Sequence, residues 1–70
     1  MQALTEIKPG ESCTVKWMVT GARIAEWMEK HSITEGSRIW VIQNCMGDLI
    51  IGTEKEKVAV GREIAFRIKV

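Results

Sequence analysis

The chain has 70 residues, of which 46% are hydrophobic and 27% charged, the balance of one ordinary folded domain. Ten Lys and Arg residues against nine Asp and Glu residues give a net charge of +1, and the two signs are interleaved, as in residues 54–57, so nucleic-acid binding through a basic surface is not expected. A chain this short builds a thin core and has little room for a deep substrate cavity, which argues against an enzyme.

The N-terminal half predicts one long strand followed by one short helix. Residues 13–20 alternate with a period of two, which is typical of a strand whose odd-numbered side chains, Trp17 among them, share the buried face. Gly21 ends this pattern. Within residues 22–31 the apolar positions then follow the i, i+3, i+4, i+7 spacing of an amphipathic helix: Ile24, Trp27, Met28 and His31.

The C-terminal half predicts short strands joined by close turns. In residues 38–43, Ile39 and Val41 are expected to face the core, which places Trp40 and Ile42 on the outer face. The remaining segments are a turn, a short apolar strand, a charged hairpin tip, a strand, a corner with one tight helical turn, and a closing strand: 44–48, 49–52, 53–56, 58–60, 61–65 and 66–70. About five strands and one inserted short α-helix favour a mainly β fold, a small barrel, as a single domain over residues 1–70.

Cysteine content and hydropathy bear on location and on metal binding. Cys13 and Cys45 lack the paired short spacings of a zinc site, although a disulfide between them is open on sequence grounds. No apolar run is long enough to span a bilayer, and the first residues lack the pattern of a signal peptide. We therefore expect a cytoplasmic protein with reduced thiols, no membrane insertion, no cofactor, no metal site and no catalytic residues.

Four motifs occur in an order that spans the chain. Residues 32–41 read Gly-[Ile/Leu]-x-x-Gly-x-x-Ile-x-Val with Ser32 in place of the first glycine. The other three are Leu4-x-x-Ile7-x-x-Gly10 near the start, a Gly47-Asp48 hairpin, and an apolar, Ala- and Arg-containing ending over residues 58–70. In this order and spacing they resemble the FeoA family, small accessory proteins of bacterial ferrous iron uptake.

The resemblance implies an SH3-like barrel with a helix inserted after the first long strand. It also implies a role in ferrous iron transport through protein–protein interaction with FeoB, a membrane transporter with a cytoplasmic GTPase domain. Whether such a protein stimulates GTP hydrolysis or only scaffolds does not follow from the residues, and neither does its oligomeric state.

Five residues are candidates for contacting the partner. Exposed tryptophan is enriched at interface hot spots, which draws attention to Trp27 on the helix and Trp40 on the outer face, although the two rings could instead pack on each other. An arginine at the corner after Gly61 could stabilise charge in phosphoryl transfer or simply satisfy local carbonyl groups. The predicted partner-binding residues are Arg23, Trp27, Met28, Trp40 and Arg62.

Three functions stay open at this point. The first is an adaptor that docks onto an iron transporter, and the second is a stand-alone regulatory SH3-like domain that docks a peptide or a neighbouring domain. The third is a small metal-handling protein that uses Cys13, Cys45 or His31. His31 and Cys13 also have structural explanations, as a helix-end residue and as a small core side chain.

Overall fold

The computed structural model describes residues 2–70 and contains six strands and three short helical segments in that range. In chain order these are η1 (Leu4–Glu6, a 3₁₀ helix), β1 (Ser12–Thr14), β2 (Trp17–Met18), α1 (Ala22–Lys30), β3 (Arg38–Gln43), β4 (Leu49–Gly52), β5 (Lys57–Val60), α2 (Arg62–Phe66) and β6 (Ile68–Lys69). None of the helices in these residues is long and apolar enough to cross a membrane.

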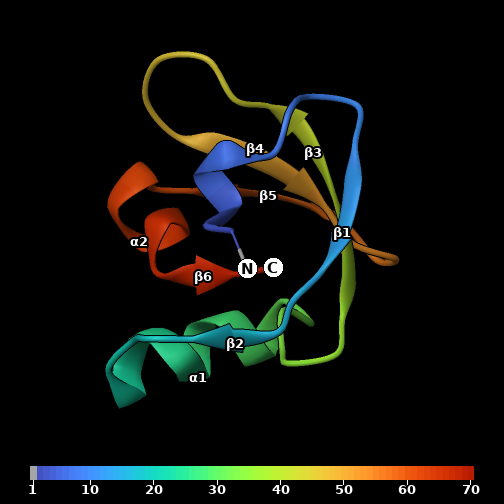
Figure 1. Cartoon of the computed structure of the whole chain (residues 1–70). Coiled ribbons are helices and arrows are strands. Elements are labelled where there is room, and N and C mark those ends of the chain that lie inside the picture. Colours follow the sequence, from blue (N-terminus) through green and yellow to red (C-terminus); the bar gives the residue numbers. More distant parts are fainter. Residues whose placement is uncertain (1) are drawn as a thin grey trace.

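The strands form two antiparallel sheets that enclose the core (Figure 1). One sheet has four strands in the order β1-β3-β4-β5, and the other is a two-stranded ribbon of β2 and β6. The chain ends lie side by side, because the backbones of Gln2 and Val70 exchange hydrogen bonds of 3.1 and 2.8 Å. The prediction of a mainly β, SH3-like barrel with an inserted helix is confirmed.

The alternation along β3 separates core from surface as predicted. Ile39 and Val41 are fully buried, whereas Trp40 and Ile42 are exposed on the opposite face. The buried side chains come from both sheets and all helical segments and form one cluster: Leu4, Ile7, Val15, Met28, Ile33, Ile39, Val41, Leu49, Ile51, Val58, Val60, Ala65 and Ile68.

The prediction of one long strand over residues 13–20 is wrong. The chain leaves the four-stranded sheet after β1 and joins the ribbon at β2, so that Lys16 donates its backbone N–H to Lys69 rather than to β3. A strand that changes sheets bends, and the inward and outward positions shift. Val15 is therefore buried, but Trp17, predicted to lie in the core, is 40% exposed.

Two details of the helical segments also differ from the prediction. Met28 is fully buried, because it is the α1 residue that points into the core, so it is not the exposed anchor that the sequence suggested. Phe66 ends α2 instead of beginning the closing strand, and it is 60% exposed. The tight helical turn predicted at residues 61–65 is present as α2.

Candidate functional site

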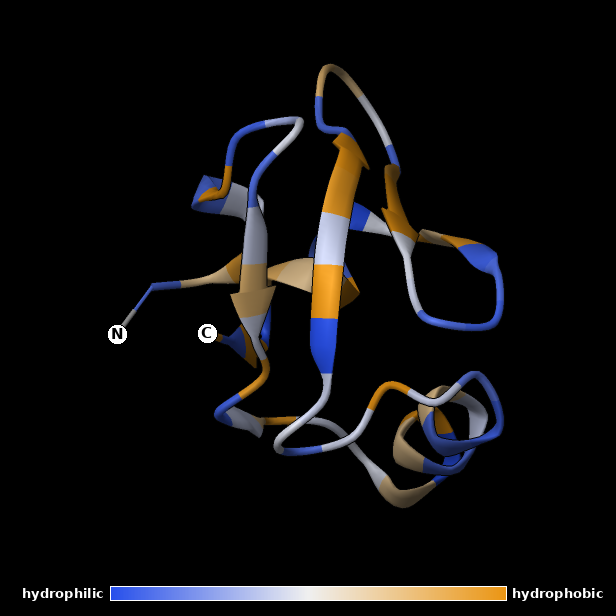
Figure 2. Ribbon diagram, turned by 90° about the vertical axis from the view of Figure 1, so that its right-hand side faces the viewer, coloured by the Kyte–Doolittle hydropathy of each residue, from blue (hydrophilic) through white to orange (hydrophobic). Residues whose placement is uncertain are grey.

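The outer face of the four-stranded sheet carries a group of apolar side chains. Trp40 and Ile42 project from β3, and Ile50 and Ala59 lie directly opposite each other on β4 and β5. Trp40 is 40% and Ile42 43% exposed, Ala59 is exposed and Ile50 half-buried. We call these four residues the outer sheet patch; Figure 2 looks onto this side of β1 and β3.

A glycine shapes the centre of the patch. Gly52 on β4 pairs with Trp40 on one side and with Lys57 on the other. A Cβ atom added to Gly52 would lie 3.3 Å from Cδ1 of Ile42, so the Ile42 side chain folds over the space that the glycine leaves. A bulge follows Val41 in β3, so that Gln43 rather than Ile42 pairs with Ile50 and both Ile42 and Gln43 are exposed.

At the rim of the patch, the strands themselves carry only cations. The four strands contain no Asp or Glu, and their only charged side chains are those of Arg38 and Lys57, whereas the turns beside the strands carry Glu11, Asp48, Glu54 and Glu56. Arg38 is the first residue of β3 and lies beside β1, where its Nη2 donates to the Ser12 hydroxyl at 3.1 Å. An apolar centre with a basic, hydrogen-bonding rim fits a protein surface that carries carboxylates around an apolar contact.

The two exposed α1 candidates lie apart from this patch. Arg23 is exposed, and the Trp27 ring packs against His31 with a centroid distance of 4.7 Å, rather than on Trp40. His31 caps the end of α1, and its Nδ1 lies 3.1 Å from a Glu56 carboxylate oxygen in the β4–β5 hairpin. This contact gives His31 a structural role, because it links the end of α1 to the β4–β5 hairpin.

Arg62 has a structural role as the first residue of α2. Its Nε donates to the Gly47 carbonyl at 3.0 Å and its Nη2 donates to the Asn44 side-chain oxygen at 2.9 Å. Asn44 in turn donates to the carbonyls of Thr5 and Ile7, at 2.9 and 2.7 Å. The interpretation that the corner arginine satisfies local carbonyl groups is confirmed. The part that Asn44 plays was not predicted from the sequence.

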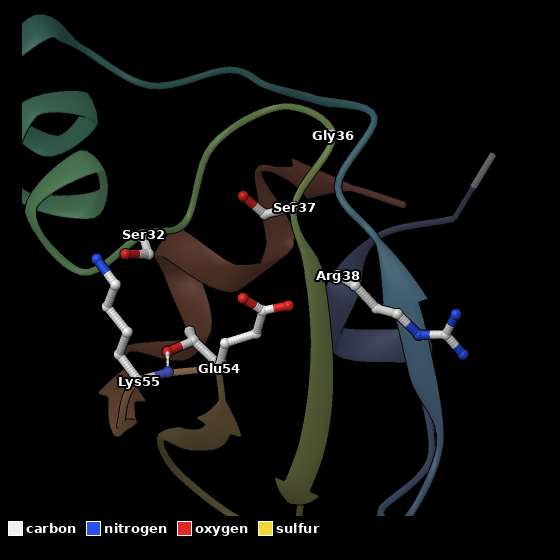
Figure 3. A pocket seen from close by; sticks show the side chains of 7 residues that line it. Ser32, Gly36, Ser37, Arg38, Glu54 and Lys55 are labelled. Atoms are coloured by element: carbon white, nitrogen blue, oxygen red, sulfur yellow. Dashed lines mark hydrogen bonds between the residues drawn. The ribbon is translucent and has the colours of Figure 1, made fainter.

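A shallow polar cleft of about 310 Å³ lies between the α1–β3 loop and the hairpin tip (Figure 3). Lys55 reaches toward Ser32 and Glu54 toward Ser37, while the Arg38 side chain turns away toward β1. The cleft brings together hydroxyl groups, one carboxylate and one ammonium group, but no histidine or cysteine that could serve as an acid–base or nucleophilic pair.

The thiols and the histidine are not gathered into a metal site. In residues 2–70 no group of three or more His, Cys, Asp or Glu side chains is placed to hold a metal ion. Both cysteines are free, with Cys45 exposed in the β3–β4 turn and Cys13 packed against the core. Burial raises the pKa of the Cys13 thiol above its ordinary value, which makes Cys13 a poorer nucleophile and metal ligand.

Comparison with known proteins gives matches along nearly the whole chain. A family model described as the FeoA domain matches residues 2–70. A protein of Methanocaldococcus jannaschii named "Putative Fe(2+) transport protein A" is 34% identical over 70 residues, which cover 100% of this chain and 85% of the relative.

Solved structures share the fold. The crystal structure of an iron uptake regulatory protein, FeoA, superposes with a TM-score of 0.83 at 27% identity, over 96% of this chain and 89% of that one. A manganese-dependent transcriptional repressor gives a TM-score of 0.86 at 18% identity, over 96% of this chain but 39% of the repressor, a likeness of fold alone. The same barrel thus occurs both as most of a small protein and as one part of a longer chain.

Proposed function

The chain belongs to the FeoA family, and from that premise we propose that it is a cytoplasmic accessory protein of ferrous iron transport that docks onto the cytoplasmic part of a FeoB-type membrane transporter. The observation that carries this proposal is the match of the FeoA domain to residues 2–70, together with the archaeal relative that aligns over the whole chain. Docking, rather than catalysis, is the activity proposed.

The outer sheet patch supports docking as the mode of action. Trp40 and Ile42 are large side chains left exposed on a hydrogen-bonded strand, so little backbone entropy is lost when a partner covers them. Tryptophan and arginine are the residue types most enriched at binding hot spots, and Arg38 lies two residues from Trp40. We therefore place the transporter contact on this face rather than on α1.

Titration of the purified chain with the isolated cytoplasmic domain of the FeoB-type transporter from the same organism tests the proposal. We expect a saturable isotherm that weakens as salt is added, because the rim cations Arg38 and Lys57 contribute to it. An unrelated GTPase domain of similar net charge serves as the control. Absence of binding to the transporter domain, or equal binding to the control, would contradict the proposed function.

A further inference from the structure

A second exposed surface lies on the β2–β6 ribbon, away from the outer sheet patch (Figure 1). Trp17 lies directly opposite Lys69, and Val19 donates its backbone N–H to the Arg67 carbonyl at 2.9 Å. Directly paired residues of an antiparallel ribbon share a face, so Trp17 and Lys69 lie on one side of it. Val19 and Arg67 follow at the end of the ribbon, and both are exposed. The intervening pair, Met18 and Ile68, faces the core.

Phe66 extends this surface. The Lys69 ammonium group lies 4.5 Å from the centre of the Phe66 ring and donates to the Phe66 carbonyl at 3.0 Å. Trp17, Val19 and Phe66 are 40, 50 and 60% exposed. We call the following set of residues the ribbon face: Trp17, Val19, Phe66, Arg67 and Lys69.

The cations of the ribbon face are not neutralised by carboxylates. Within residues 2–70 the only ion pair joins His31 and Glu56, so neither Arg67 nor Lys69 is paired with an acidic side chain, Glu63 of the neighbouring α2 included. Aromatic rings beside Lys and Arg are the combination found at membrane–water interfaces, where rings enter the headgroup region and cations contact anionic headgroups.

The size of the ribbon face favours a lipid surface over a protein partner. Aromatic side chains bury roughly 150–250 Å² each, so the exposed parts of Trp17 and Phe66 offer about 100 Å² each. A stable protein interface takes about 800 Å² per partner. Two strands of two residues fall far short of that area.

We infer that the ribbon face attaches the protein reversibly to an anionic phospholipid bilayer. Trp17, Val19 and Phe66 enter the headgroup region, and Arg67 and Lys69 contact the lipid phosphates. A few rings and two cations bind a membrane only weakly. Weak membrane binding is sufficient when the protein also docks onto a membrane-embedded partner, because the two contacts then act together. Attachment to lipid requires no transporter, so vesicle binding and transporter binding can fail separately.

Sedimentation with lipid vesicles tests the inference without any protein partner. We expect the chain to bind vesicles of phosphatidylglycerol and phosphatidylcholine in equal parts, to bind phosphatidylcholine alone far more weakly, and to be released by salt. Each cation near an anionic surface raises the partition coefficient about fivefold, so Arg67→Gln with Lys69→Gln should lower it about 25-fold. The matched pair Arg38→Gln with Lys57→Gln removes the same charge from the outer sheet and should lower it less than about fivefold.

Single-tryptophan variants locate the bound surface. The variant Trp27→Phe/Trp40→Phe keeps only Trp17, and brominated lipids in the anionic vesicles should quench its fluorescence. The variant Trp17→Phe/Trp27→Phe keeps only Trp40, and the same lipids should leave its fluorescence unchanged. Circular dichroism of each variant before mixing confirms that it is folded. Three results would each overturn the inference. The unmodified chain could fail to sediment with anionic vesicles, the two double charge variants could lower the partition coefficient equally, or brominated lipids could quench Trp40 in place of Trp17.

Discussion

Replacing Met28 with alanine is expected to lower the free energy of unfolding by about 2–5 kcal/mol, the range measured when a buried Met or Leu is truncated. Met28 is 0% exposed and is the α1 side chain that lies fully in the core. A domain of 70 residues is stable by roughly 4–10 kcal/mol, so this single loss removes a large part of the total. Chemical denaturation followed by circular dichroism measures it.

Glu29→Ala is the matched control for Met28→Ala. Glu29 is the next residue of the same helix, is exposed, and takes part in no side-chain hydrogen bond or ion pair among residues 2–70. Its replacement should change the free energy of unfolding by no more than about 0.5 kcal/mol. If Met28→Ala is as stable as Glu29→Ala, then α1 is not anchored through Met28 and the packing described above is wrong.

Replacing Asn44 with alanine is expected to cost about 2–4 kcal/mol, because it breaks three hydrogen bonds at once. The side chain donates to the carbonyls of Thr5 and Ile7 and accepts from Arg62, and so holds η1, the β3–β4 turn and α2 together. Alanine leaves the two carbonyl groups without their donor, and part-buried polar groups without partners are costly. The midpoint of thermal unfolding should fall accordingly.

Asn44→Asp separates the two halves of this network. Aspartate retains the acceptor for Arg62 but supplies no donor for the Thr5 and Ile7 carbonyls. We expect Asn44→Asp to be destabilised nearly as much as Asn44→Ala, whereas Arg62→Lys should cost less, because it disturbs only the solvent-facing side of the network. An Asn44→Ala protein with unchanged stability would contradict the structural role given to Asn44.

Patterns of local origin could be predicted from the sequence. The helix over residues 22–31 and the alternation of β3 follow from the spacing of apolar residues, which sets the buried face wherever a segment stays within one sheet or packs on one surface. The outward position of Trp40 and Ile42 could be predicted for the same reason. The FeoA motifs extended these local patterns to the whole fold.

Features that depend on contacts between distant residues could not be predicted. Trp17 continues the alternation of Cys13 and Val15 in the sequence, and only the change of sheet between β1 and β2 turns it outward. Asn44 looks like an ordinary turn residue, because its partners lie 37 and 39 residues before it. Trp27 and Met28 are adjacent in the predicted helical stripe, and the spacing alone does not determine which of them is buried. In the structure Met28 packs into the core and Trp27 stays partly exposed.

Binding of Trp40→Ala and Trp27→Ala to the cytoplasmic domain of the FeoB-type transporter tests the central claim most directly. The two tryptophans are similarly exposed, at 40 and 37%, but only Trp40 belongs to the outer sheet patch. We expect Trp40→Ala to lose about 2 kcal/mol of binding free energy, close to a 30-fold rise in Kd, with a change of about 1 kcal/mol or less in folding stability. Trp27→Ala should bind within about threefold of the unmodified chain, because Trp27 lies on α1, outside the proposed docking surface. A Kd that rises for Trp27→Ala and stays unchanged for Trp40→Ala would move the docking surface to α1 and contradict this account.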